Sequence, residues 1–209
     1  MDQVEENQNI DIKEKIAYHL EQIIDEAETM KSSIGEKDYC LLCEIAQIKD
    51  HFNTIQSSAS FYYLKSYIEH FTNKTIEIAR ALQNLSDKRH GCLMIIERSD
   101  SVEQYIQAGV QINADCSSRL IESIFFPGNP LHDGALLIKT DHIISAANVL
   151  PLTSQNFGGE KIGTRHRAAI GLSECTDALI LIVSEETGRM SFALDGTLYP
   201  ISSAETRIQ

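Results

Sequence analysis

Apolar residues recur at every third or fourth position along the first 85 residues, which is the spacing of one face of an α-helix. A first helix is predicted with an apolar stripe that comprises Ile12, Ile16, Leu20, Ile23, Ala27 and Met30. Asn9 or Asp11 could cap its start, and residues 32–35, which end in a glycine, should end it. A second helix is expected from about Asp38, with an inward face that comprises Leu41, Leu42, Ile45, Ile48 and Phe52.

These two helices predict an αα-hairpin over residues 1–60. Residues 57–60 read Ser-Ser-Ala-Ser and are the expected linker to a third helix, over residues 61–85. Two helices alone cannot bury their apolar stripes, so the hairpin must dock on another surface. It is therefore either a passive packing appendage or an oligomerisation or regulatory element.

Short apolar runs separated by turn residues make up the rest of the chain and predict strands that alternate with helices. Strands are expected at residues 92–96, 135–138, 143–148, 178–183 and 191–193, and helices at residues 117–125 and 164–171. All four prolines lie beyond residue 126. The predicted fold class is α/β: a mostly buried, mixed central sheet flanked by helices over residues 61–209, preceded by the hairpin.

Charge is unevenly spread along a chain whose formal net charge is −12. Residues 1–60 hold 13 acidic and 5 basic side chains, a net of −8, and residues 61–209 hold 17 and 13, a net of −4. Long nucleic acids are excluded as partners because binding their phosphates needs a basic face. No stretch approaches the roughly 18 apolar residues of a membrane span, and the acidic start argues against a secretion signal. We expect a cytoplasmic location.

The five cysteines are an odd number without the spacing of a disulfide framework. Cys40 and Cys43 form a Cys-x-x-Cys within a helical pattern, with no second pair for zinc and no βαβ context for redox chemistry. We therefore expect them to be buried thiols. Cys92, Cys116 and Cys175 are expected in or near the core.

Residues 131–136 read Leu-His-Asp-Gly-Ala-Leu and precede a predicted strand. The Asp133 carboxylate could accept a proton or bind a divalent metal, and Gly134 would let the backbone approach a ligand closely. The His132 imidazole suits Mn²⁺ or a similar first-row ion better than Mg²⁺. Two plainer interpretations stay open: a hairpin turn at Asp133-Gly134, and a surface or hydrogen-bonded histidine.

Residues 163–167 read Gly-Thr-Arg-His-Arg, at the start of a predicted helix. Guanidinium groups bind phosphate through two hydrogen bonds, and the hydroxyl and the N–H groups of a helix start add further donors. Residues 184–188, Ser-Glu-Glu-Thr-Gly, follow a strand and could hold a metal or a ribose hydroxyl. The alternatives are a basic surface turn and a charged surface turn.

Asp133-Gly134-Ala135 and Arg165-His166-Arg167 resemble the Asp-Gly-Ala and Arg-His-Arg motifs of the bacterial diadenylate cyclase domain. The resemblance extends to residues 123–125, 130–132, 150–152, 176–178 and 184–188, and so covers roughly residues 61–209. It is closest to the class with a short helical N-terminal extension, which is associated with sporulating bacteria and has neither transmembrane helices nor a DNA-binding region. It implies that two ATP are condensed into cyclic di-AMP, with release of two pyrophosphates.

The resemblance also implies roles for particular residues. Asp133 would lie near the ribose 3′-hydroxyl and help to activate it, and a metal would bind His132 and the substrate phosphates. Mn²⁺ is the favoured metal, with Mg²⁺ or Co²⁺ as alternatives. The nucleoside would contact Gly134, Ala135 and Leu150, the last through its backbone. The phosphates would contact Thr164 and Arg165, with Ser184 and Glu186 on the phosphate and metal side. His166 and Arg167 would complete the ATP-binding motif, one of them as a structural brace.

The implied reaction needs two ATP held face to face, so the active unit would be at least a homodimer. ATP is the expected substrate, and neither a nucleic acid nor a membrane is expected as a partner. Two other functions use the same residue types: a metal-dependent nucleotide phosphohydrolase, and a non-catalytic ATP-binding oligomerisation module.

Overall fold

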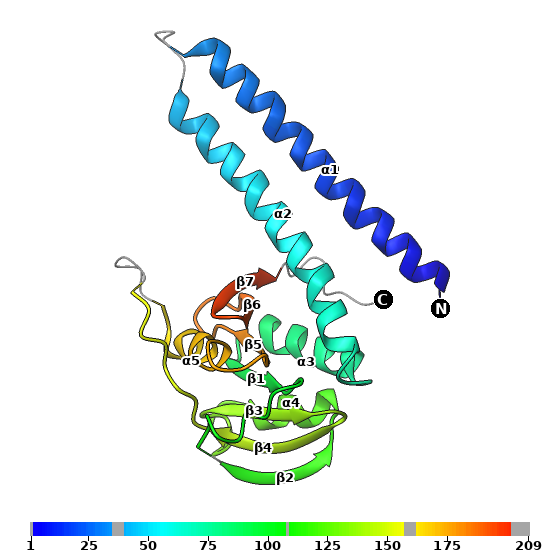
Figure 1. The fold of residues 1–209 in the computed structure, drawn as a ribbon, viewed down its shortest axis with the longest axis vertical. Helices are drawn as coiled ribbons and strands as arrows, with labels where there is room; N and C mark the ends of the chain where they lie inside the picture. Colours follow the sequence, from blue (N-terminus) through cyan, green and yellow to red (C-terminus); the bar gives the residue numbers. More distant parts are fainter. Residues whose placement is uncertain (1, 35–39, 108, 157–161, 202–209) are drawn as a thin grey trace. The chain divides into compact units, whose positions relative to one another are not determined.

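The computed structural model describes residues 2–34, 40–107, 109–156 and 162–201 (Figure 1). The chain divides into two compact units, Met1–Tyr63 and Leu64–Gln209. The predicted start near Asp38 and the glycine at position 35 lie outside the described residues.

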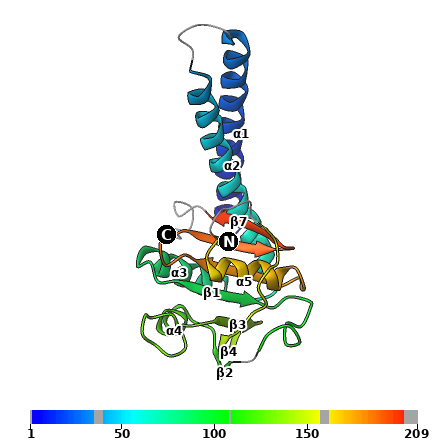
Figure 2. The ribbon, with the colours of Figure 1, turned by 90° about the vertical axis from the view of Figure 1, so that its left-hand side faces the viewer.

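The first unit is made of helices α1 (Asp2–Ser33) and α2 (Leu41–Glu69), of which the end of α2 belongs to the second unit. Both are seen along most of their length in Figure 2. The expected end of the first helix near Ser33 is confirmed, but Asn9 and Asp11 lie inside α1 and do not cap it.

The serine-rich linker is the main error in the helical part of the prediction. Residues 57–60 are helical, and α2 continues through them to Glu69. The sequence has neither glycine nor proline between residues 36 and 90, and serine lowers helix propensity only slightly. Ser-Ser-Ala-Ser was therefore insufficient to end the helix. The predicted third helix over residues 61–85 is instead the end of α2 followed by α3 (Thr75–Asp87).

Most of the expected inward face of the second helix is exposed among the residues that the structure describes. Leu42 is 78% exposed, Phe52 55% and Ile45 46%. The apolar spacing correctly identified residues on one helix, but it carries no information on what covers them. These side chains remain available to another surface.

The second unit is built on a seven-stranded sheet in the order β2-β4-β3-β1-β5-β6-β7. Only β1 and β3 pair in parallel, and all other neighbours are antiparallel. The sheet is mixed, so the predicted fold class is confirmed. Its strands are β1 (Cys92–Ile96), β2 (Val110–Asp115), β3 (Ala135–Lys139), β4 (His142–Asn148), β5 (Leu179–Val183), β6 (Met190–Leu194) and β7 (Thr197–Ile201).

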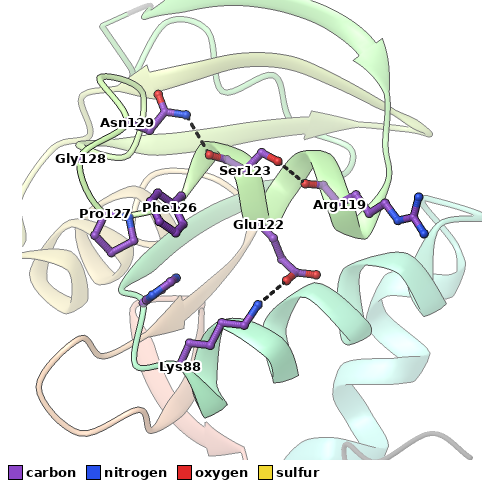
Figure 3. A pocket seen from close by; sticks show the side chains of 9 residues that line it. Lys88, Arg119, Glu122, Ser123, Phe126, Pro127, Gly128 and Asn129 are labelled. Carbon is purple, nitrogen blue, oxygen red and sulfur yellow. Dashed lines mark hydrogen bonds and ion pairs between the residues drawn. The ribbon is translucent and has the colours of Figure 1, made fainter.

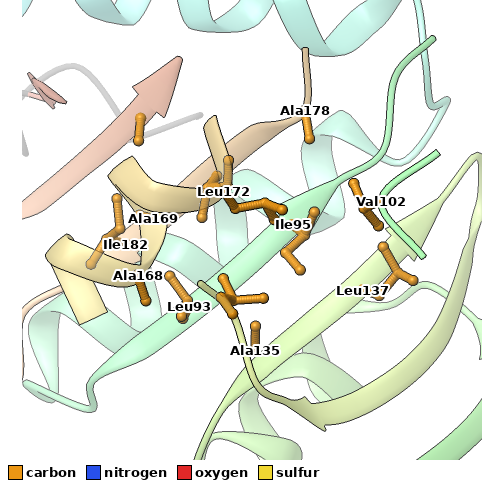
Figure 4. Close-up of a cluster of buried hydrophobic side chains, with 13 residues drawn as sticks. Leu93, Ile95, Val102, Ala135, Leu137, Ala168, Ala169, Leu172, Ala178 and Ile182 are labelled. Atoms are coloured by element: carbon orange, nitrogen blue, oxygen red, sulfur yellow. The ribbon is translucent and has the colours of Figure 1, made fainter. Parts of the chain in front are cut away.

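Helices lie on both sides of the central strands (Figure 1). Alternate strand residues contribute to a buried cluster with α5 (Thr164–Ser173), among them Leu93, Ala135, Ile182 and Ala168 (Figure 4). Successive strand residues point to opposite faces, so Met94, which is also buried, faces away from that cluster. Helices α3 and α4 (Ser118–Ile124) pack against each other and carry further core residues.

The two strands that the sequence did not predict, β2 and β7, form the edges of the sheet. β2 alternates between exposed and half-buried residues and contains Gln, Asn and Asp. β7 contains Pro200, which cannot donate to a ladder and is tolerated at an edge. Edge strands need no continuous apolar run, which explains why the pattern missed them.

The cysteines differ from their expected environments in three cases. Cys40 and Cys43 are exposed and joined by a disulfide, and Cys175 is an exposed free thiol. Cys92 and Cys116 are buried as expected, and burial raises their pKa values to about 12 and about 11. The helical pattern around Cys40 and Cys43 was correct, but burial was wrongly inferred from it.

Candidate nucleotide site

The Asp-Gly-Ala motif and the segment that begins with Ser184 lie at the same end of the central sheet. β1 pairs in parallel with β3, with Met94 opposite Leu136, so the residues before the two strands are neighbours. β1 pairs antiparallel with β5, with Cys92 opposite Val183. The segment that ends in Asp133-Gly134 and the segment that begins with Ser184 therefore flank the start of β1, about 10 Å apart at two strand spacings.

Arg165 reaches this sheet end from the first turn of α5. Its Nη1 forms an ion pair of 2.5 Å with Oε2 of Glu185, the residue after Ser184. A Cβ on Gly91, just before β1, would lie 2.6 Å from Arg165 Nη1 and 2.9 Å from Glu185 Cβ. Glycine is thus required for the guanidinium to lie against the backbone here. Glu185 belongs to the acidic segment 184–188 that the sequence singled out, but its pairing with Arg165 was not predicted.

Gly134 begins the approach to β3 and does not join two strands, so the hairpin-turn interpretation is wrong. Its φ is +110°, and an added Cβ would lie 2.8 Å from the backbone of Ala147 and of Asn148. The next residue is held by a buried amide, because Asn148 Nδ2 donates to the Ala135 carbonyl at 2.8 Å. These backbone contacts fix the position of the chain just before β3, where Asp133 is exposed.

The Asn148 side chain is itself fixed by two further hydrogen bonds. Its Oδ1 accepts from the N–H of Gly109 at 3.0 Å and from the Ser145 hydroxyl at 2.9 Å. A buried amide held by three hydrogen bonds specifies a single backbone arrangement more strictly than apolar packing does. The position of the Asp-Gly-Ala segment therefore depends on β4 as well as on β1.

His132 is half-buried and oriented by the loop that precedes it. Its Nδ1 lies 2.5 Å from the Asn129 carbonyl oxygen. A carbonyl can only accept, so Nδ1 is the donor in this contact, and Nε2 is the ring nitrogen that could bind a metal, which is the usual arrangement of a metal-binding histidine. The interpretation of His132 as a hydrogen-bonded histidine is confirmed. This hydrogen bond is compatible with metal binding through Nε2.

The first turn of α5 presents Thr164, Arg165 and their backbone N–H groups. Gly163 is the N-cap and makes no side-chain capping bond. His166 is half-buried, and burial, followed by the positive charge of Arg165, lowers its pKa. The first turn of a ten-residue helix, with no side-chain cap at Gly163, is suited to an anion.

Arg167 makes bracing contacts with an extended segment. Its Nη2 donates to the Thr153 carbonyl at 3.3 Å, and its own carbonyl accepts from the Thr153 N–H at 3.1 Å. These contacts hold the segment after β4 against α5. Among the described residues of the motif, Arg167 is the one whose side chain bonds to the segment after β4.

The remaining predicted residues differ in accessibility. Leu150 is 7% exposed and packs in the same cluster as Ala135 and Ala168, so only its backbone could contact a ligand. Ser184 is half-buried, and its Oγ accepts from the Thr187 N–H at 3.4 Å. Glu186 is exposed. The sheet end thus brings Asp133, Arg165 and Ser184 to one side of the unit, while the Leu150 side chain points into the core.

A groove of about 860 Å³ lies between the end of α3, α4 and the loop after α4 (Figure 3). Lys88 and Glu122 form an ion pair of 3.0 Å on its wall. None of the predicted site residues lines it. It adjoins the candidate site through Asn129, whose carbonyl oxygen lies next to Nδ1 of His132.

Potential metal ligands do not form a cluster among the described residues. In the part of the chain that the structure describes, no three His, Cys, Asp or Glu side chains form a metal-binding group. His132 could supply a single protein ligand through Nε2. Among the described helices, none is both long and apolar enough to cross a membrane.

Comparison with known proteins relates nearly the whole chain to diadenylate cyclases. A family model described as "DisA bacterial checkpoint controller nucleotide-binding" matches residues 79–198. A second model, described as the N-terminal part of diadenylate cyclase CdaS, matches residues 3–71. The cyclic di-AMP synthase CdaS of Bacillus subtilis is 54% identical over 98% of this chain and 97% of its own length.

Two solved structures extend the similarity to the fold. A crystal structure titled as a hypothetical membrane spanning protein from Bacillus cereus is 47% identical, has a TM-score of 0.73, and covers 92% of this chain and 94% of that one. DacA from Staphylococcus aureus is 40% identical, has a TM-score of 0.58, and covers 61% of this chain and 86% of that one. The motifs, the fold and the extent of these matches together show that the chain belongs to the diadenylate cyclase family.

Proposed function

We propose that this chain condenses two ATP into cyclic di-AMP with release of two pyrophosphates, in the cytoplasm, where ATP is abundant. The observation that carries the proposal is the convergence of a carboxylate and a guanidinium, Asp133 and Arg165, beside the start of one strand. The carboxylate can activate a hydroxyl by accepting its proton, and the guanidinium can neutralise phosphate charge. Family membership supports the same reaction.

In the proposed reaction, the 3′-oxygen of one ATP attacks the α-phosphorus of the other, and pyrophosphate leaves. Asp133 accepts the hydroxyl proton. Thr164, Arg165 and the start of α5 bind the phosphates of the ATP held by the same protomer, with Ser184 and Glu186 beside them. Phosphoryl transfer of this kind depends mainly on positioning and charge neutralisation, which are what these groups supply.

Each ATP supplies one nucleophile and one electrophile, so the simplest reacting unit is two protomers with their sites facing each other. One protomer would bind ATP but could not close the ring. A homodimer or a larger assembly is therefore part of the proposal. The exposure of Asp133 is compatible with a nucleotide that approaches from a second protomer.

A divalent metal completes the proposal, with Mn²⁺ favoured over Mg²⁺ or Co²⁺. Nε2 of His132 would bind it, and the other ligands would come from the substrate phosphates. When bound, the cation lowers the pKa of the substrate hydroxyl and neutralises phosphate charge. A His132→Gln variant should need at least about tenfold more Mn²⁺ for half-maximal rate; an unchanged requirement would remove His132 from the metal site.

The central experiment incubates the purified protein with ATP and Mn²⁺ and separates the products by chromatography. Wild-type protein should yield cyclic di-AMP, and Asp133→Asn should lower the rate at least about 100-fold, since general base catalysis contributes 10²–10⁴. Asp87→Asn is the matched control, because Asp87 is exposed on α3 and accepts a hydrogen bond only from Gln83 among the described residues. AMP or ADP as the sole product would instead establish a phosphohydrolase.

The hairpin, residues 1–60, is proposed as an oligomerisation and regulatory element for the catalytic domain, residues 61–209. Leu42 and Ile45 lie on the uncovered face of α2. Replacing both with serine should reduce the size of the assembly in light scattering and change specific activity. If both quantities matched wild type, the hairpin would be a passive appendage.

A further inference from the structure

A disulfide between Cys40 and Cys43 lies at the start of α2, and both residues are exposed. Cys40 is the last residue before the helix. Its carbonyl accepts from the backbone N–H of Cys43 at 3.0 Å and of Glu44 at 3.3 Å. The pair thus spans the N-cap and the first turn of a 29-residue helix.

The other cysteines occupy different environments. Cys92 and Cys116 are buried, and desolvation raises the pKa of each thiol well above its ordinary value. Neither is accessible to a thiol reagent in the folded chain. Cys175 is exposed and free, and it belongs to the second unit. Solvent therefore reaches one disulfide and one single thiol among the described residues.

A structural role does not explain the disulfide well. A cross-link stabilises a fold mainly by restricting the unfolded chain, and its effect grows with the length of the closed loop. Cys40 and Cys43 are only three positions apart, so little unfolded chain is restricted. α2 also has many further turns that hold it without the cross-link.

Position and exposure instead favour thiol chemistry. A helix start stabilises negative charge, and thiolates in Cys-x-x-Cys segments at such sites are more readily formed than isolated ones. Disulfide exchange also needs a sulfur that an incoming thiolate can reach. Cytosolic disulfides, where they occur, are usually transient rather than structural.

We propose that Cys40 and Cys43 form a reversible redox couple that exchanges with low-molecular-weight thiols. A thiolate of the small molecule attacks one sulfur, the Cys40–Cys43 bond breaks, and the other cysteine leaves as a thiolate. A second small-molecule thiolate then attacks the mixed disulfide and displaces the first cysteine. Two cysteine thiols and one small-molecule disulfide result, so two electrons have passed to the protein, and the reverse sequence oxidises it.

The experiment equilibrates the full chain with reduced and oxidised glutathione at graded ratios, stops exchange with acid, alkylates free thiols, and analyses peptides by mass spectrometry. The peptide that holds Cys40 and Cys43 should change from doubly alkylated to internally bonded in one two-electron transition. Cys175 is the internal control, because as a single thiol it can only remain free or carry one glutathione.

Two variants sharpen the result. In Cys40→Ser or Cys43→Ser, the remaining thiol should accumulate as a glutathione mixed disulfide, because its resolving partner is gone. The proposal is overturned if the wild-type pair stays doubly alkylated at every glutathione ratio. It is also overturned if the bond persists in excess dithiothreitol, or if each cysteine binds glutathione independently, as Cys175 does. None of these outcomes depends on cyclase activity.

Discussion

The two units of the chain bury their apolar residues to very different degrees. In the second unit, β1, β5 and β6 are buried along their whole length. In the first unit, Ile24, Leu42 and Phe52 are each more than half exposed. The second unit therefore has a core of its own, whereas the helices of the first present apolar surface that only another surface could cover. The candidate site residues belong to the second unit, which has its own core.

The largest expected difference between the units comes from one matched pair of substitutions. Ile95→Ala removes a side chain with 0% exposure from the central strand, and it should lower the free energy of unfolding by about 2–5 kcal/mol. Ile45→Ala acts at 46% exposure and should cost less than about 1 kcal/mol in dilute protein. Urea unfolding of both variants measures the two effects. Equal losses would show that the α2 face is already covered in solution.

A smaller effect is expected where the second unit restricts its backbone. Gly134→Ala combines φ of +110° with backbone atoms at 2.8 Å, and it should cost about 2–4 kcal/mol. Gly128→Ala is the control, since Gly128 has φ of +91° but open space around it, and should cost about 1 kcal/mol. Urea midpoints would separate steric crowding from conformational strain. Similar losses in both variants would refute the close approach at Gly134.

The smallest effect is a pH dependence that each unit contributes separately. The pKa of His166 is lowered by burial and by Arg165, and that of His19 by burial, His51 and Lys15. A lowered folded-state pKa means that the unfolded state binds the proton more tightly. Stability is therefore complete above about pH 6.5, the ordinary histidine value, and declines as the pH falls below it.

Histidine variants can show which unit produces the loss of stability at low pH. His166→Asn should flatten the loss of stability between pH 7 and pH 5 for the second unit, and His19→Asn for the first. Urea midpoints across that range, read with hydrogen exchange on each unit, provide the measurement. A slope that survives both substitutions would have to come from other groups.

Sequence patterns predicted the centre of the fold better than its periphery. β1 was predicted residue for residue because a strand covered on both faces is a continuous apolar run. The edge strands were missed because one side of each is free of the sheet. The serine-rich linker was wrong because helix continuation depends on tertiary packing as well as on propensity, and the inward face of α2 was wrong because periodicity does not reveal what covers a face.

The candidate site shows the same limit. Short motifs identified Asp133 and Arg165 because several chemical groups occur within a few positions of each other. The pairing of Glu185 with Arg165 was not predicted, because it arises only when α5 and the end of β5 meet in space. Local chemistry is visible in a sequence, but a contact between distant segments needs the fold.

The strand β1 lies between the two halves of the candidate site and sets the spacing between them. Because β3, β1 and β5 are joined by ladder hydrogen bonds, the distance between the Asp133 side and the Ser184 side cannot change without breaking the sheet. No hinge within these strands could open or close the site. Control of such a reaction would therefore act on which second protomer reaches the site, and this is a matter of assembly.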